Sequence, residues 1–130
     1  MKIYLAAAYS RREEMLPYAE ALRFYGHEVT SRWIEGNHEG PGITEEMCAV
    51  DDLQDVLAAE CIISFTEVPA SSRNRGGRHV EFGIGIATNQ HLILVGPREH
   101  VFHHLGRVLQ YDTWDDALTN LRPVGVAVSA

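Results

Sequence analysis

Two short apolar runs decide the fold: Cys61-Ile62-Ile63-Ser64-Phe65 and His91-Leu92-Ile93-Leu94-Val95-Gly96. Each has the length and apolar character of a strand that is buried on both faces. Between them, residues 79 to 88 read as a helix that is apolar nearly all round. The order strand, helix, strand predicts a parallel pair joined by a helical crossover.

The same alternation extends to both ends of the chain. Further strands are expected at Ile3 to Ala8, His27 to Ile34 and Val108 to Tyr111, and further helices at Ser10 to Gly26, Thr44 to Glu60 and Thr113 to Leu121, with a helical turn at Glu99 to Leu105. Ser10 is expected to cap the first helix, and Pro17 to leave residues 10 to 16 as a looser turn. The pattern predicts one doubly wound α/β domain, flavodoxin-like or Rossmann-like, with about five parallel strands flanked by helices. It spans residues 1 to 121, and residues 122 to 130 form a C-terminal tail.

Two loops stand out between these elements. Residues 35 to 44 contain three glycines and a proline and are expected to form a mobile loop, and residues 69 to 77 are rich in basic and small residues. In doubly wound sheets, ligands bind beyond the carboxyl ends of the strands. The chemistry is therefore expected where the loops after the first and third strands meet.

Composition narrows the range of partners. Eleven basic and 18 acidic residues among 130 give a net charge of −7, which disfavours a long nucleic acid as partner. The chain has no signal-peptide pattern and no uninterrupted apolar run of ~20 residues, so no membrane association is expected. We expect a cytoplasmic protein, of cellular or viral origin.

Glu81 is the first candidate for catalysis because it stands in the apolar helix between the two buried strands. One interpretation is an acid in the first helical turn that satisfies exposed N–H groups. The other is a nucleophile that the helix dipole keeps ionised, with space above it provided by Gly76 and Gly77. The second interpretation is favoured because a charged group in such surroundings is often functional.

Asp52 is the second candidate. At helical spacing its row contains Cys48 and Val56, so Asp52 is expected to border the core, whereas Asp51 and Asp55 share a row without an apolar member. A solvated helix acid is the alternative. Paired carboxylates ~5 Å apart carry out glycosidic cleavage with retention, in which one attacks the anomeric carbon and the other assists departure or positioning. N-glycosides fit the same scheme.

Several motifs resemble those of the nucleoside 2-deoxyribosyltransferases and of their relatives, the 2′-deoxynucleoside 5′-phosphate N-hydrolases. The resemblance extends from Met1 to about Leu121, and its most specific part is Gly76 to Gly83. The motifs are Ile3-Tyr4-Leu5-Ala6, Asp52-Leu53 with Ala58-Ala59-Glu60, and Gly76-Gly77-Arg78-His79-Val80-Glu81-Phe82-Gly83.

This resemblance implies roles for four residues. Glu81 matches the nucleophile that forms a covalent deoxyribosyl intermediate, and Asp52 matches the aspartate that protonates the base or positions the sugar. Tyr4 resembles the tyrosine that orients the nucleophile, with a plain core aromatic as the alternative. His103 falls where relatives place an asparagine or serine that reaches into a neighbouring subunit's site. Such sharing implies a homodimer or a higher homo-oligomer.

One departure leaves the substrate open. The transferases have a further aspartate six positions before the nucleophile, where this chain has Arg75. A basic residue there favours a phosphate-bearing substrate, for which Arg73, Arg75 and Arg78 with the amides of Gly76 and Gly77 form a suitable cradle. However, residues 6 to 9 lack the small polar residues of phosphate-using relatives. The sequence therefore leaves two reactions open: transfer of the sugar to a second base, and hydrolysis of a 5′-monophosphate.

The remaining predictions concern binding. Trp33 is expected to stack on the nucleobase, with a core position as the alternative. No metal is predicted at His100, His103 and His104, because no acidic or thiol partner stands at ligand spacing, and no cofactor is expected. The predicted partner is a small nucleoside or nucleotide. Two rival functions stay open: a nucleotide phosphoribohydrolase with a Gly-Gly-x-Gly-Thr-x-x-Glu motif, and a non-catalytic nucleotide-binding module.

Overall fold

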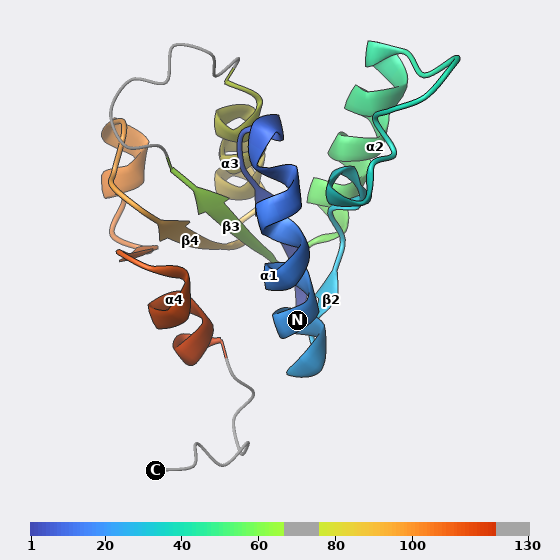
Figure 1. Cartoon of the computed structure of the whole chain (residues 1–130). Helices are drawn as coiled ribbons and strands as arrows, with labels where there is room; N and C mark the ends of the chain where they lie inside the picture. The colour runs from blue at the N-terminus through green and yellow to red at the C-terminus, as the bar shows by residue number, and fades with distance from the viewer. Residues whose placement is uncertain (67–75, 122–130) are drawn as a thin grey trace.

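The computed structural model describes residues 1–66 and 76–121, which form a parallel sheet covered by helices on both faces (Figure 1). The five strands lie in the order β2-β1-β3-β4-β5, and every pair is parallel. They are β1 (Lys2–Ala6), β2 (Glu28–Val29), β3 (Cys61–Phe65), β4 (His91–Val95) and β5 (Val108–Tyr111). The predicted doubly wound, five-stranded parallel sheet is confirmed. The predicted tail, residues 122 to 130, lies outside the described residues.

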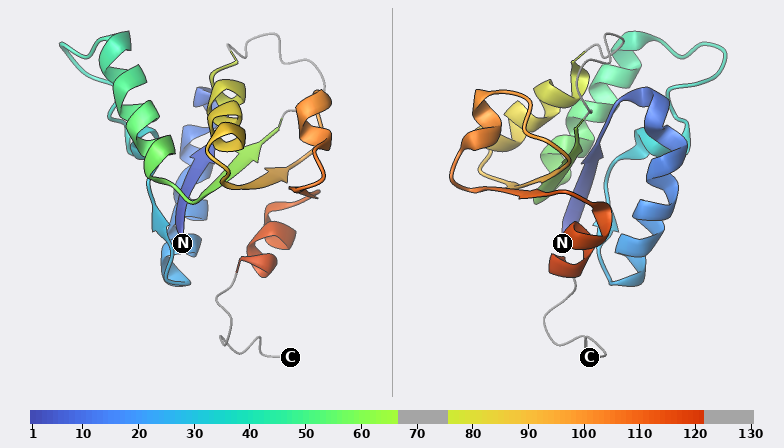
Figure 2. Two further views of the ribbon diagram at one scale, coloured as in Figure 1. Left: turned by 180° about the vertical axis from the view of Figure 1, so that it is seen from behind. Right: turned by 60° about the vertical axis from the view of Figure 1, so that its left-hand side comes forward.

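The helices form a layer on each face of the sheet, as the two views of Figure 2 show. They are α1 (Arg12–Phe24), α2 (Glu45–Ala58), α3 (Gly77–Ala87) and α4 (Trp114–Asn120), with short 3-10 helices η1 (Tyr9–Arg11), η2 (Arg32–Glu35) and η3 (Val101–His104). Tyr18 of α1 stacks on Trp114 of α4, with ring centroids 4.5 Å apart, so these two helices share a face. Helices α2 and α3 pack together on the other face. No helix among the described residues is long and apolar enough to cross a bilayer.

Helix α3 lies unusually close to the sheet. Tyr4 of β1, Ile62 of β3 and Leu92 of β4 are in register, so they form one row across the sheet. Gly85 of α3 lies over this row, and a Cβ there would be 2.9 Å from Ile62 Cγ1 and 3.1 Å from Leu92 Cδ2. Real Cβ atoms do not approach neighbours so closely in packed interiors. The absence of a side chain at residue 85 therefore brings the whole of α3 toward the strands.

The second strand is much shorter than predicted. It ends at Val29, and the chain turns at Ser31, whose Oγ accepts a hydrogen bond from the Leu5 N–H (3.1 Å). Arg32 then donates its backbone N–H to Asp55 (3.0 Å) and begins η2. The β-favouring composition was overridden by these two side-chain contacts, which no local pattern reveals.

The first helix also differs from the prediction. It begins at Arg12 after the 3-10 turn η1, and Ser10 makes no capping hydrogen bond. Pro17 lies inside the regular helix rather than at its start. Proline is accepted there because it is exposed and lies in the second turn, so the carbonyl that lacks its partner is close to the helix start.

Candidate active site

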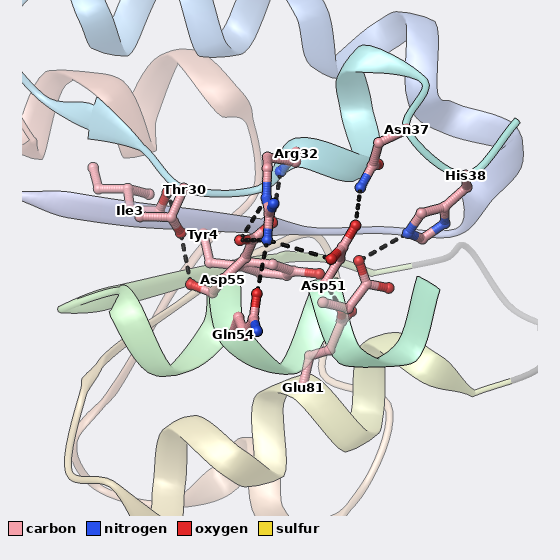
Figure 3. A network of polar contacts seen from close by, with 11 residues as sticks. Ile3, Tyr4, Thr30, Arg32, Asn37, His38, Asp51, Gln54, Asp55 and Glu81 are labelled. Atoms are coloured by element: carbon pink, nitrogen blue, oxygen red, sulfur yellow. Dashed lines mark hydrogen bonds and ion pairs between the residues drawn. The ribbon is translucent and has the colours of Figure 1, made fainter. Parts of the chain in front are cut away.

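Glu81 and Tyr4 form the centre of the site. The Tyr4 hydroxyl, on β1, donates a hydrogen bond to Oε2 of Glu81, on α3, and the two side chains point toward one another in Figure 3. Tyr4 is fully buried. Its position in the row with Ile62 and Leu92 places the hydroxyl under α3, where the close approach at Gly85 brings Glu81 within reach. The predicted contact between tyrosine and glutamate is thus present.

The electrostatics of Glu81 differ from the expectation. Gly76, with φ of 82°, precedes α3, and the helix begins at Gly77, so Glu81 is its fifth residue and lies beyond the first turn. The field of a helix N-terminus falls off within that turn. Burial therefore dominates and raises the pKa of Glu81 to about 8, although the hydrogen bond from Tyr4 acts in the opposite direction. The ligand-free carboxyl is protonated over most of the neutral range.

Tyr4 remains a donor under these conditions. Burial raises the pKa of its hydroxyl well above the ordinary value, and the neighbouring charges of Glu81 and Asp52 raise it further. A phenol that holds its proton this firmly donates to a carboxylate whenever one is present. Tyr4 therefore orients Glu81 and stabilises its ionised form.

Asp52 reaches the same environment from α2. Desolvation raises its pKa, even though His38 lies beside it with Nε2 2.9 Å from Oδ1. The charge of Asp52 in turn raises the pKa of both Glu81 and Tyr4. The sequence allowed α2 and α3 to converge but did not require it. In the structure they bring Glu81 and Asp52 close enough for the charge of Asp52 to raise the pKa of Glu81.

The segment from 35 to 44, predicted to be a mobile loop, is held by side-chain contacts. Asn37 donates to Asp51 (3.0 Å), and His38 contacts Asp52. The exposed ring of Tyr9 stacks on His38 at 5.9 Å between centroids, and the Tyr9 hydroxyl donates to Glu39 (2.6 Å). Sequence reasoning missed His38. The only signal was a run of polar residues, Asn37 to Glu39, without any indication of what it would face.

Asp55, on the same helix, has a different environment. It is the most buried acid of α2, and both of its oxygens accept hydrogen bonds from Arg32 (2.9 and 3.1 Å from Nε, 3.0 Å from the backbone N–H), as Figure 3 shows. The sequence placed Asp55 in a row without apolar members, and its burial corrects that interpretation. Arg32 is 23 positions away in the chain, which is why spacing could not reveal the pair.

The predicted phosphate cradle is only partly described, and one of its members is engaged elsewhere. Arg78 is 4% exposed, and its guanidinium holds the carboxylate of Glu99 in a two-pronged ion pair (Nη2 to Oε2, 2.7 Å). Its charge is neutralised within the fold, which contradicts its assignment to a phosphate. Arg73 and Arg75 lie outside the described residues. Gly76 caps α3 and Gly77 is its first residue, whereas the sequence predicts both glycines in the loop before the helix.

Trp33 is a core residue. It lies in η2 rather than at the end of a strand, is 4% exposed, and donates its indole N–H to the Leu5 carbonyl (2.8 Å). A ring covered in this way has no free face for a nucleobase, so the stacking prediction is wrong. The exposed aromatic ring next to Trp33 is that of Tyr9, whose centroid lies 6.1 Å from that of Trp33 and which is 44% exposed.

His103 does not lie where a residue shared with a neighbouring subunit would lie. The side chain is fully buried, and Nδ1 accepts a hydrogen bond from the Glu99 N–H (3.0 Å). Burial lowers the pKa of His103 to about 4, so the ring is neutral. It packs against Phe82, His79 and His100 within one chain. These three histidines are the described residues that offer a metal-ligating cluster.

The arrangement can perform a definite kind of chemistry. Glu81 has a hydrogen-bond donor on one oxygen and a second carboxyl nearby, and neither acid is paired with an arginine or lysine in the described ranges 1–66 and 76–121. Burial raises the pKa of both acids, which favours proton exchange with a bound molecule, and their ionised forms attract a centre that becomes positive during a reaction. Attack on a carbon with carbocation character fits these properties.

Comparisons with known proteins support the fold. No family model and no curated protein sequence matches the chain. Among solved structures, a 2-deoxyribosyltransferase from Bacillus psychrosaccharolyticus is 18% identical, covers 93% of this chain and 96% of its own, and superposes with a TM-score of 0.69. The CMP N-glycosidase of Clostridium botulinum is 22% identical, with coverage of 93% and 98% and a TM-score of 0.63.

A third solved structure, a conserved protein from Enterococcus faecalis, is 12% identical, with coverage of 93% and 96% and a TM-score of 0.66. All three chains are matched along nearly their whole length, so the likeness concerns a complete domain rather than a shared motif. The resemblance inferred from the sequence motifs is therefore confirmed at the level of the fold.

Proposed function

We propose that this protein cleaves the N-glycosidic bond of a nucleoside or nucleotide, preferably a 2′-deoxy one, through a covalent glycosyl intermediate on Glu81. One observation carries the proposal: Glu81 is a largely buried carboxyl that accepts a hydrogen bond from Tyr4, and the charge of Asp52 raises its pKa. The likeness to a 2-deoxyribosyltransferase and to a CMP N-glycosidase supports the same class of reaction.

In the first half-reaction, an oxygen of Glu81 attacks C1′ as the bond from C1′ to the base nitrogen breaks. The transition state has oxocarbenium character, and the carboxylate stabilises its positive charge. The base leaves with the bonding electrons and takes a proton from Asp52. The nearby His38 holds the Asp52 carboxyl in position for this transfer.

In the second half-reaction, another base or a water molecule attacks C1′ from the side that the first base left. The bond from C1′ to Glu81 breaks, the incoming group gives its proton to Asp52, and the free carboxylate is restored. Two displacements at one carbon retain its configuration. Tyr4 donates to Glu81 whenever the carboxylate is free and thereby fixes its direction of attack.

A substrate with a 5′-phosphate is the second candidate, because one solved structure with this fold is a CMP N-glycosidase. Arg78 cannot supply the positive charge, since Glu99 neutralises it. The phosphate alternative therefore depends on Arg73 and Arg75. A double Arg73→Ala/Arg75→Ala variant should lose activity on a monophosphate and keep it on the nucleoside if those side chains bind phosphate.

A homo-oligomer is part of the proposal. Four apolar side chains share the outward face of α2 and are between 46% and 54% exposed: Met47, Val50, Leu53 and Leu57. An apolar stripe of this kind on a soluble domain marks a contact surface. We expect light scattering after gel filtration to give a dimer or larger species, and Leu53→Glu to shift the protein toward the monomer.

The activity is tested with a panel of nucleosides and their 5′-monophosphates, each with and without a free acceptor base, and products are separated by chromatography. Release of base or formation of a new nucleoside is expected. Exposure to a 2′-fluoro nucleoside should add one fluorinated sugar to the intact mass, and Glu81→Gln should remove the adduct. If no substrate yields product or adduct, the protein is a binding module instead.

A further inference from the structure

Three histidines come together on the side of α3 away from Glu81. His79 is in the first turn of α3, His100 precedes η3, and His103 is inside η3. His100 Nε2 lies 3.1 Å from His79 Nδ1, and the rings of His100 and His103 are tilted by 34° with centroids 3.7 Å apart. One nitrogen from each residue lies within 4.8 Å of the other two. The sequence places His79 far from the other two, 21 positions before His100, so only folding makes the cluster.

We infer that His79, His100 and His103 form a site for a late first-row transition ion, such as Zn²⁺ or Co²⁺, which joins α3 to η3. Nitrogen ligands about 2.0 to 2.1 Å from a tetrahedral zinc lie roughly 3.3 Å apart, close to the separation of the nearest pair here. Imidazole is a preferred ligand for these ions, whereas magnesium and calcium require oxygen. This inference does not depend on the proposed function.

One buried nitrogen supports the assignment independently. Among the described residues, Nε2 of His103 has no hydrogen-bond partner, and His103 is fully buried. Buried polar atoms in folded proteins normally have a partner. An unpartnered nitrogen on a ring that packs against His79 and His100 indicates that a ligand or an ordered water belongs in this cluster.

The hydrogen bonds of the cluster show which protons and contacts the ion would displace on binding. The contact between His79 and His100 requires one shared proton, and the ion takes its place. Nδ1 of His103 accepts from the Glu99 N–H, so Nε2 carries the proton in the metal-free protein. Coordination through Nε2 moves that proton and gives up the Glu99 contact. The ion is therefore held reversibly rather than as a permanent structural centre.

The charges around the cluster are balanced. The Glu99 carboxylate attracts a cation and the Arg78 guanidinium repels one, and the two are paired with each other. Two positions separate His79 from Glu81 along α3, which places them on nearly opposite faces of the helix. The ion is therefore expected to stiffen the start of α3 without contacting the substrate.

Titration of the untagged full-length chain with Co²⁺ and Zn²⁺ tests the inference. We expect one ion per chain by calorimetry, a visible absorption band of nitrogen-coordinated Co²⁺, and a melting temperature that rises by several degrees with excess Zn²⁺ and returns after chelation. His79→Ala should weaken binding about tenfold or more. His100→Asn provides a second variant with a small change in volume.

His104→Ala is the matched control, because His104 lies in the same 3-10 helix but is exposed and outside the cluster. It should bind the ion like the unaltered chain. Equal affinity in the His79→Ala and His104→Ala proteins would overturn the inference, as would the absence of any binding at a hundredfold excess of ion. Glu81→Gln should leave ion binding unchanged.

Discussion

Asp52 and Asp55 lie three residues apart on α2, yet one carboxylate is paired with a histidine and the other with an arginine. Asp55 is nearly inaccessible and is neutralised by Arg32 through both carboxylate oxygens. Asp52 is more accessible, but it is bonded to His38 rather than to an arginine, and its pKa is raised. A paired acid of the first kind contributes to the fold, whereas an acid without a permanent cation beside a second carboxyl is available for chemistry.

Glu81 extends the contrast to α3. Its pKa rises to about 8 because burial is offset only by a neutral donor, Tyr4. An arginine in the place of Tyr4 would keep the carboxylate ionised and paired, which would weaken it in the proposed role of nucleophile. In the proposed mechanism, this unfavourable burial of a carboxylate lies where a positively charged transition state would offset it.

The largest effect is expected for Glu81→Gln. If Glu81 forms the covalent bond, kcat should fall at least about a thousandfold, because an amide cannot replace the carboxylate as nucleophile. Steady-state assays on the best substrate of the panel measure this loss. Glu46→Gln, an exposed acid of α2, is the control and should retain full activity. A fully active Glu81→Gln protein would falsify the mechanism.

The same substitution should stabilise the protein above neutral pH. The unfolded carboxyl ionises near its ordinary pKa of 4.5 and the folded one near 8, so the unfolded state binds fewer protons between these values and stability falls as pH rises. The difference between 8 and 4.5, which is 3.5, corresponds to roughly 3 to 5 kcal/mol above pH 8. Urea unfolding at pH 5 and pH 9 should show that Glu81→Gln gains stability over the parent only at the higher pH.

Asp52→Asn should have the next largest effect. If Asp52 protonates the departing base, kcat should fall about a hundredfold with an ordinary base and much less with one that leaves as a stable anion. Asp51→Asn is the neighbouring control, since Asp51 is bonded to Asn37 rather than to the site. Equal slowing with both kinds of leaving base would assign Asp52 to positioning alone.

Tyr4→Phe should change the pH profile more than the maximal rate. The value of kcat/KM should rise with pH and reach half of its maximum near pH 8, as the free enzyme's Glu81 ionises. Because the Tyr4 hydrogen bond lowers that pKa, its loss should move the rising limb to higher pH and reduce activity at pH 7 by about tenfold. An unmoved limb would show that another group controls the profile.

Asp55→Asn should have the smallest effect on activity. Loss of the charged partner of Arg32 should lower the free energy of unfolding by about 1 to 3 kcal/mol, while kcat of the folded protein stays within a few-fold of the parent. Denaturant melts and assays on the same preparation separate the two quantities. A large loss of kcat without destabilisation would place Asp55 in the site and remove the distinction from Asp52.

The parts of the site that the sequence predicted are those with a local signal. Glu81 was identifiable because a charged residue interrupts an apolar helix. The buried strands were identifiable because their residues are nearly all apolar. The proposed reason for its ionisation was wrong, since α3 begins at Gly77, two residues before the predicted start. Two residues are half a helical turn, which is enough to remove Glu81 from the strongest field of the helix end.

The parts that were missed depend on partners far apart in the chain. The sequence predicted that Arg78 is free to bind a phosphate. In the structure, Glu99, 21 positions later, neutralises its charge. The family resemblance predicted that His103 reaches outward into a neighbouring subunit, but the packing of η3 against α3 buries its side chain. Pairing between distant residues is a property of the tertiary structure, and no periodicity in a single sequence encodes it.

Gly85 has a further consequence for protein engineering. The bare backbone at this residue sets how far α3 stands from β3 and β4, and Glu81 lies one turn earlier on the same side of the helix. The distance of the Glu81 carboxyl from the sheet therefore depends on a residue that has no part in the proposed reaction. A design that copies the proposed site into another parallel sheet should transfer residues 81 to 85 together, because Glu81 alone would not lie at the same distance from the strands.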